Sequence, residues 1–207
     1  MHIEKISNTP VTSNCYVINC SNSDDCIIID PGSNCNSILN NYLIDNSLRP
    51  YKVILTHEHF DHIWGVLDLS TRYSFELISN ENCKQAISNP KKNLSIFYDQ
   101  VGFSITREVK TIEELSYNFN WNNNNLFLFN TPGHSEGSIC IQLNEILFCG
   151  DILIQNEKTV TKFPGGSSQK LTETLSKIKS NFSPETLILS GHGENFLFKN
   201  YYNYFNI

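Results

Sequence analysis

One short motif constrains this sequence most, because it places three histidines and an aspartate within six residues. The motif reads His57-Glu58-His59-Phe60-Asp61-His62. It comes soon after residues 51–55 (YKVIL), a mostly apolar run that reads as a short buried strand. Alternate side chains of an extended segment point the same way, so His57 and His59 can bind one ion, while Asp61 and His62 lie where the next helix is expected to begin. The motif predicts a metal site on a loop beyond a strand, with room for two adjacent ions.

Further metal-type side chains follow other apolar runs. They are His134 after residues 126–129, Asp151 after residues 146–149, and His192 after residues 186–189. Each run is a predicted strand, so every one of these side chains is expected on a loop just beyond a strand end. A polar loop that merely happens to be rich in histidine would not produce this distribution. The sequence therefore predicts a metal centre assembled from four strand ends.

The ordered set of these seven residues resembles the ligand set of the metallo-β-lactamase superfamily, over about residues 15–193. The resemblance implies an α/β fold, a four-layer αββα sandwich, with two metal ions at one edge of its paired sheets. It implies that His57, His59 and His134 bind one ion and that Asp61, His62 and His192 bind the other. Asp151 is expected to bridge the two ions, and Asp61 and Asp151 are the expected catalytic residues. We expect residues 1–207 to form a single domain of this type, which their number allows.

Three more segments resemble glyoxalase II and its shorter relatives, which hydrolyse thioesters. They are residues 131–138 (TPGHSEGS), 148–151 (FCGD) and 164–167 (PGGS). The resemblance implies a dinuclear hydrolase in which a hydroxide held between the ions attacks a thioester of glutathione, coenzyme A or a carrier protein. Lys162, Phe163 and Gly165 are the expected substrate-binding residues. Few residues follow His192, so a carrier longer than glutathione is favoured.

Other functions remain open on the same residues. A lactone or phosphodiester hydrolase would use the same two-metal site, a persulfide dioxygenase would use a single iron, and a binding protein would use no chemistry. β-Lactam hydrolysis is less favoured, because Asp151 stands where many true β-lactamases of the superfamily have a cysteine. Two divalent ions are expected. Zinc suits histidine-rich ligation, and the oxygen ligands also accommodate iron or manganese.

Composition limits the partners. The net charge is −6 and there is no basic run, which argues against nucleic acid and leaves a small or carrier-bound thioester. Seven cysteines, an odd number without a CxxC spacing, argue against a disulfide framework and are expected to be small buried residues. The sequence has no signal-like or membrane-spanning run, so we expect a cytoplasmic protein that does not bind membranes. The oligomeric state is left open.

Hydrophobic periodicity predicts a layered order of strands and helices. Strands are expected near residues 3–6, 15–20, 26–29, 51–55, 75–78, 126–129, 137–143, 145–149 and 186–189. Helices are expected over residues 38–43, 63–67, 171–178 and 194–204. Two readings of residues 89–107 are open: a lid over the site, or, with more weight, a helix packed on the sheet through its aromatic side chains.

Overall fold

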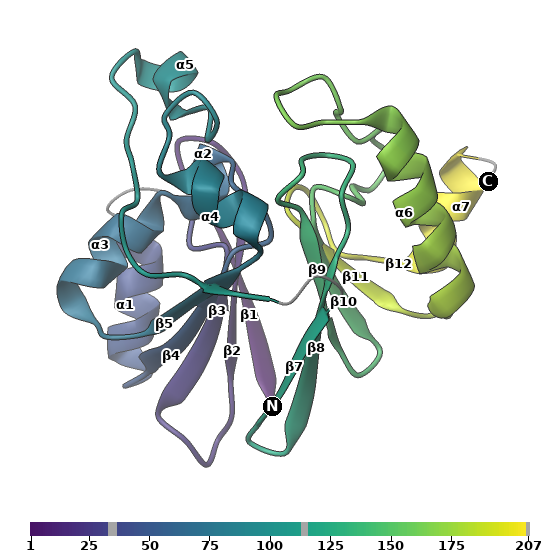
Figure 1. Ribbon diagram of the computed structural model, residues 1–207. Helices are drawn as coiled ribbons and strands as arrows, with labels where there is room; N and C mark the ends of the chain where they lie inside the picture. The colour runs from purple at the N-terminus through teal and green to yellow at the C-terminus, as the bar shows by residue number, and fades with distance from the viewer. Residues whose placement is uncertain (33–36, 113–115, 206–207) are drawn as a thin grey trace.

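Two six-stranded sheets face each other at the centre of the computed structural model, which describes residues 1–32, 37–112 and 116–205 (Figure 1). The first sheet contains, in order across the sheet, β1 (His2–Ser7), β2 (Asn14–Asn19), β3 (Asp25–Ile29), β4 (Arg49–Ile54), β5 (Glu76–Ser79) and β6 (Lys110–Thr111). The second contains β12 (Phe196–Leu197), β11 (Leu187–Ser190), β10 (Ile146–Gly150), β9 (Ile139–Leu143), β8 (Asn124–Asn130) and β7 (Ser116–Trp121).

Helices cover the outer face of each sheet (Figure 1). Those on the first sheet are α1 (Ser37–Asp45), α3 (Gly65–Arg72) and α4 (Glu81–Ile87), and those on the second are α6 (Ser168–Asn181) and α7 (Phe198–Phe205). Two short helices, α2 (Phe60–Ile63) and α5 (Ser95–Asp99), lie at one end of the molecule. This arrangement confirms the predicted αββα sandwich.

Strands such as β3 and β10 are apolar along most of their length, because both of their faces are buried. In β3, Cys26 and Ile28 point into the core beneath the first helical layer, while Ile27 and Ile29 point into the core between the sheets. In β10, Phe148 joins the core between the sheets, and Cys149 faces the helices of the second layer. Alternation along a strand thus makes Cys149 a core residue, as predicted.

The six cysteines of the described residues are all free and buried, as expected for small apolar side chains. Cys35 lies outside the described residues. Within residues 1–32, 37–112 and 116–205, no helix combines the length and apolar character needed to cross a membrane.

Parallel strand pairing places the candidate ligand loops at one edge of the sandwich. The strands β3, β4, β5 and β6 pair in parallel in the first sheet, and β10 pairs in parallel with β11 in the second. The carboxyl ends of parallel strands meet at the same edge, so loops that follow β3, β4, β10 and β11 are brought together.

Residues 89–107 do not form the packed helix that was given more weight. Only residues 95–99 are helical, as α5, and the Phe97 side chain is 73% exposed. The buried Asn93 amide explains the looped path, since it donates to the carbonyls of Ile87 (3.2 Å) and Phe103 (2.9 Å). Phe103 alone of the segment's phenylalanines packs against the core of the first layer. That this segment acts as a lid stays a prediction.

The end of the described chain also differs from the expected single helix over residues 194–204. Residues 196–197 form β12, which pairs with β11, and α7 begins only at Phe198. Asn122 and Asn123 have φ of +49° and +60° and form the tight turn between β7 and β8.

Candidate metal centre

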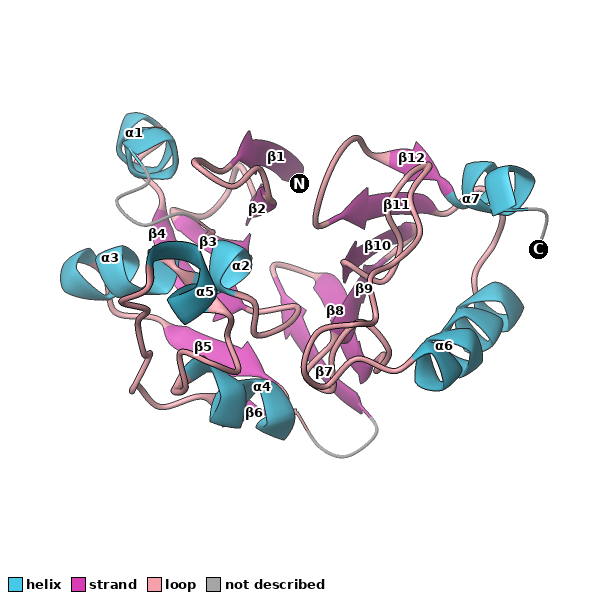
Figure 2. Ribbon diagram, turned by 90° about the horizontal axis from the view of Figure 1, so that it is seen from above, coloured by secondary structure: helices cyan, strands magenta, loops and turns pink. Residues whose placement is uncertain are grey.

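All seven predicted ligands lie at the edge where β4, β8, β10 and β11 end, the face seen from above in Figure 2. The motif after β4 supplies four of them, with Asp61 and His62 inside α2 as expected. The other three are His134 after β8, Asp151 after β10 and His192 after β11. Residues far apart in the chain are therefore brought into one site.

The first cluster consists of His57, His59 and His134, each of them buried. Each offers one ring nitrogen, and these nitrogens lie within 4.8 Å of one another. Nδ1 of His59 is 2.9 Å from Nε2 of His134. The rings of His57 and His59 both lie against the His134 ring, with centroids 4.8 and 4.6 Å away, so the three side chains converge.

The second cluster consists of Asp61, His62 and His192. Nε2 of His62 lies 3.3 Å from Nε2 of His192 and 3.4 Å from Oδ2 of Asp61. Nε2 of His192 lies 3.3 Å from the same carboxylate oxygen. Ligand atoms of one tetrahedral zinc ion, each about 2.0–2.1 Å from the metal, are about 3.3 Å apart, so these separations suit such an ion.

Asp151 lies between the two clusters. Its Oδ1 is 3.5 Å from Nε2 of His62, while its Oδ2 is 3.5 Å from Nε2 of His192 and 3.6 Å from Nε2 of His134. The backbone approaches this carboxylate so closely that a Cβ at Gly191 would lie 2.3 Å from Oδ1 of Asp151. One carboxylate thus faces ligands of both clusters.

Hydrogen bonds from the ring nitrogens that point away from the clusters fix the orientation and the tautomer of two histidines. Nδ1 of His134 donates to the Val160 carbonyl (2.8 Å), and Nδ1 of His192 donates to the Thr12 carbonyl (2.5 Å). Each bond assigns the ring proton to Nδ1 and leaves the Nε2 lone pair facing the cluster. This is the usual arrangement around metal-binding histidines.

Asp30 is a site residue that the sequence reasoning missed. Its Oδ1 accepts from the Thr56 amide (2.8 Å), and its Oδ2 accepts from the Thr56 hydroxyl (2.5 Å) and from Nδ1 of His62 (3.0 Å). The Thr56 hydroxyl oxygen lies 3.0 Å from Nδ1 of His57 and can accept its proton. Asp30 therefore orients one histidine of each cluster. Both of its oxygens are engaged in these bonds, so it supports ligands rather than acting as one.

A family model described as the metallo-beta-lactamase superfamily matches residues 8–192. The chain belongs to the metallo-β-lactamase superfamily. Among its relatives is a probable metallo-hydrolase of Bacillus subtilis, YqgX, which is 28% identical over 187 residues, 89% of this chain and 86% of that protein. A hydroxyacylglutathione hydrolase of Salmonella arizonae is 28% identical over 173 residues, 83% of this chain and 59% of that protein.

Solved structures of the superfamily share the fold along nearly the whole chain. BLEG-1, described as a B3 metallo-beta-lactamase, superposes with a TM-score of 0.88 at 25% identity, covering 98% of this chain and 97% of its own. TTHA1623 in a di-iron-bound form gives a TM-score of 0.81 at 21% identity, covering 95% of this chain and 96% of its own.

The side chains of the site are suited to binding divalent metal ions. Nε2 of His57 and Oδ1 of Asp151 are buried and have no hydrogen-bond partner within the described protein. Leaving buried polar atoms without partners is costly, and a bound cation would satisfy a lone pair aimed at it. The chemistry of the donors, imidazole and carboxylate, suits zinc or iron.

The two clusters differ in charge before a cation binds. Burial, together with the neighbouring histidines, holds the pKa of His57 well below its usual value and lowers that of His59 to about 3. At His62 burial also acts to lower the pKa, but Asp61, Asp151 and Asp30 outweigh it and raise the pKa to about 10. At neutral pH the first cluster thus offers free lone pairs, while a cation entering the second must displace a proton.

The predicted substrate-binding residues lie on the loop between β10 and α6. The Phe163 ring meets the His59 ring edge-on, with centroids 5.7 Å apart, and is 46% exposed. Gly165 has a φ of +84°, which favours glycine at this bend. Lys162 is exposed on the same loop.

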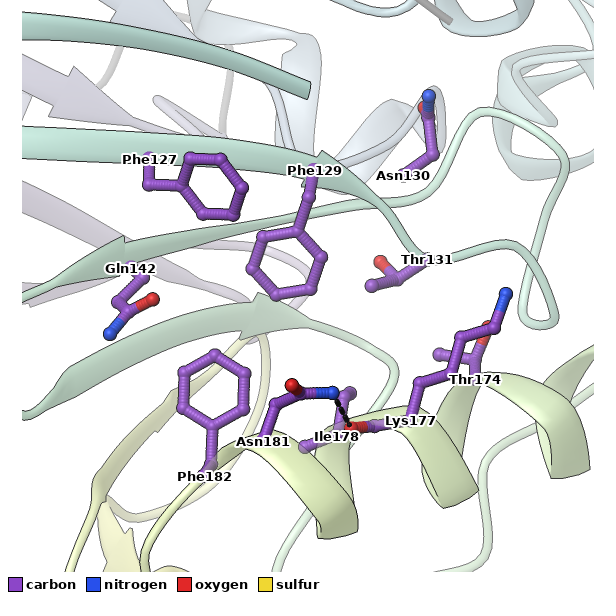
Figure 3. Close-up of a pocket in the computed structure, with 10 residues that line it drawn as sticks. All are labelled: Phe127, Phe129, Asn130, Thr131, Gln142, Thr174, Lys177, Ile178, Asn181 and Phe182. Carbon is purple, nitrogen blue, oxygen red and sulfur yellow. Dashed lines mark hydrogen bonds between the residues drawn. The ribbon is translucent and has the colours of Figure 1, made fainter. Parts of the chain in front are cut away.

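One of the hollows that the described residues form adjoins the centre. A hollow of about 490 Å³ is lined by Phe60, Leu94, Phe97, Tyr98, Phe163 and Pro164. Another of about 390 Å³ lies on the outer face of the second sheet, between β8, β9 and α6, where Phe129 stacks on Phe182 at 5.9 Å (Figure 3). None of the predicted ligands lines this second hollow.

Proposed function

We propose that this protein is a dinuclear, metal-dependent hydrolase of thioesters. The observation that carries the proposal is the position of Asp151, whose two oxygens face Nε2 of His62 on one side and of His134 on the other. Two divalent cations, most readily zinc, would supply a nucleophile derived from water at neutral pH, because they lower the pKa of water from 15.7 to about 7.

The protein's own residues position the reaction. In the proposed roles, Asp61 and Asp151 balance the positive charge of the clusters, and the seven ligands fix the place of the acyl carbonyl. Thioester hydrolysis forms a C–O bond to the water oxygen and breaks the C–S bond, and the thiol leaves with a proton. Ser135 donates to the buried Glu58 carboxylate at 2.8 Å, a loop-holding contact, so a serine nucleophile is not part of the proposal.

Similarity supports the thioester as substrate. The chain resembles a hydroxyacylglutathione hydrolase over 83% of its length and carries glyoxalase II-like motifs around His134 and Asp151. We propose that Lys162, Phe163 and Gly165 contact the substrate and that Lys162 attracts an anionic thiol carrier.

An activity panel on protein of measured metal content tests this proposal. The panel contains acyl thioesters of glutathione, coenzyme A and a carrier protein, together with a β-lactam, a lactone and a phosphodiester. We expect thioester hydrolysis that falls by orders of magnitude in Asp151→Ala, with the fold retained. Lys162→Ala should lower kcat/KM for thioesters of anionic carriers more than for thioesters of uncharged carriers.

Other outcomes of the panel would replace the proposal. β-Lactam, lactone or phosphodiester hydrolysis without thioester hydrolysis would move the activity to that substrate. One iron per chain with sulfite production from a persulfide would indicate a dioxygenase, and no reaction with both clusters filled would favour a binding protein.

A further inference from the structure

Exposed apolar side chains concentrate at the mouth of the metal centre. Of the nine large apolar side chains that are exposed in the described part of the chain, five lie in residues 97–101 and 160–163. Figure 1 shows these two segments, the α5 loop and the loop before α6, at the same end of the molecule. The Val160 carbonyl accepts the His134 proton, which ties the second segment directly to the centre.

Phe97 and Tyr98 of the first segment and Phe163 of the second line the hollow next to the centre, which we name the mouth hollow. Phe163 connects it to the first cluster through its edge-on contact with His59. Phe60 follows His59 in the chain and packs on Tyr98 with ring centroids 5.0 Å apart. The hollow therefore lies beside a predicted ligand, and aromatic rings make up most of its wall.

The chemistry of the lining restricts what can occupy the mouth hollow. Its six lining residues are apolar or aromatic, and the Tyr98 hydroxyl is the one polar side-chain group among them. Phosphates of coenzyme A or carboxylates of glutathione would lose their hydration there without gaining a partner. An alkyl or aryl group would instead cover aromatic surface that is otherwise left in water.

We infer that the mouth hollow binds the acyl chain of the substrate, so that the enzyme prefers medium-length or aromatic acyl thioesters over acetyl thioesters. The inference rests on the proposed thioester hydrolysis and names the acyl side of that substrate. With the thioester carbonyl at the clusters beside His59, the acyl chain lies along the rings of Phe163, Phe60 and Tyr98. The thiol carrier lies outside the mouth hollow.

An acyl-length series tests this inference on the metal-loaded full chain. The substrates are N-acetylcysteamine thioesters with straight acyl chains of increasing length, and the readout is kcat/KM. The expected rise is about fourfold for each added CH₂ until the hollow is filled. A flat or falling series would overturn the inference while thioester hydrolysis itself stands.

A matched pair of variants locates the effect. Tyr98 in the hollow and Tyr51 on β4 are equally exposed, at 44% and 45%. Tyr98→Ala is expected to lower the octanoyl-to-acetyl ratio of kcat/KM by about fivefold to tenfold, because it removes an aromatic wall. Tyr51→Ala should leave that ratio unchanged. An equal effect of both variants, or a preference that follows the thiol carrier instead of acyl length, would overturn the placement.

A binding measurement separates this inference from the proposed function. Calorimetry compares octanoate with acetate on metal-loaded wild-type and Tyr98→Ala protein. Tighter binding of octanoate that depends on Tyr98 supports an apolar site even if no thioester is hydrolysed, in which case only the proposed reaction fails. Equal affinity for the two carboxylates overturns the mouth hollow as an acyl site.

Discussion

His57 and His62 belong to different clusters, yet the positions of both depend on the Asp30 carboxylate. Asp30 contacts His62 directly and reaches His57 through the Thr56 hydroxyl. All of these groups are buried, so water cannot replace a lost partner. Such supporting hydrogen bonds set the ring orientation on which metal affinity depends.

Replacement of Asp30 by asparagine should therefore weaken metal binding at both clusters. The amide oxygen can still accept from the Thr56 amide, and asparagine tolerates the positive φ of +51° at this position. Its NH₂ group cannot accept from His62 or from the Thr56 hydroxyl. Chelator competition should show metal affinity lowered by about 10-fold to 100-fold.

The exposed Asp45 on α1 offers a control, and Asp45→Asn should bind metal like the wild type. A loss at the second cluster alone would mean that the Thr56 hydroxyl orients His57 without help from Asp30.

At the scale of elements, α6 holds the loop that carries His134. The Thr174 hydroxyl donates to the Pro132 carbonyl (2.7 Å), and the Ser167 amide at the start of α6 donates to the Gly133 carbonyl (2.8 Å). The contact is close, since a Cβ at Gly133 would lie 2.6 Å from Cα of Leu171. Thr174 and Thr131, the first residue after β8, both line the outer hollow of Figure 3, so this hollow adjoins the start of the loop that leads to His134.

Thr174→Val should loosen this loop. Valine has nearly the shape of threonine but leaves the part-buried Pro132 carbonyl without its donor, and a typical hydrogen bond contributes about 0.5–1.5 kcal/mol. We expect a lower free energy of unfolding in urea and weaker binding at the His134 cluster. Thr174→Ser retains the hydroxyl and should recover metal affinity, whereas equal metal affinity in both variants would show that α6 does not position His134.

The elements differ in how far the sequence alone could predict them. The ligand loops were predictable because each follows a largely apolar run, and buried strands with parallel partners, such as β3 and β10, read as nearly continuous apolar segments. The role of Asp30 was not predictable, because its partners Thr56 and His62 lie 26 and 32 residues away in the chain. Phe97 and Tyr98 look like core residues by type, and only the hydrogen bonds of Asn93 explain why their segment leaves the core.

In the whole molecule, each cluster draws on both sheets. In the first cluster, His57 and His59 follow β4 of the first sheet, and His134 follows β8 of the second. In the second cluster, His62 also follows β4, and His192 follows β11 of the second sheet. An ion bound to either cluster would link the two halves of the sandwich. Metal removal is therefore a test of the site that needs no substrate.

Chelation should lower the melting temperature. A ligand at 100 times its dissociation constant stabilises the native state by about 2.7 kcal/mol, and each kcal/mol shifts the melting temperature of a protein of this size by about 2–4 °C. One filled cluster should thus raise it by about 5–10 °C in calorimetry. Asp151→Ala should respond less to the chelator, and an unchanged wild-type melting curve would argue against metal binding.

The distribution of ligands over both sheets affects how bound metal should change the folding and unfolding rates of the protein. We expect the ligand loops to meet only after strands distant in the chain, such as β3 with β4 and β10 with β11, have paired, because closing such long-range contacts limits how fast a chain folds. Bound metal would then stabilise contacts that form after the folding barrier, so it should slow unfolding and leave refolding unchanged. Stopped-flow experiments with and without chelator would reveal this asymmetry, and a refolding rate that rises with metal would contradict it. The lifetime of each folded molecule would then depend on metal supply, even where its synthesis and folding do not.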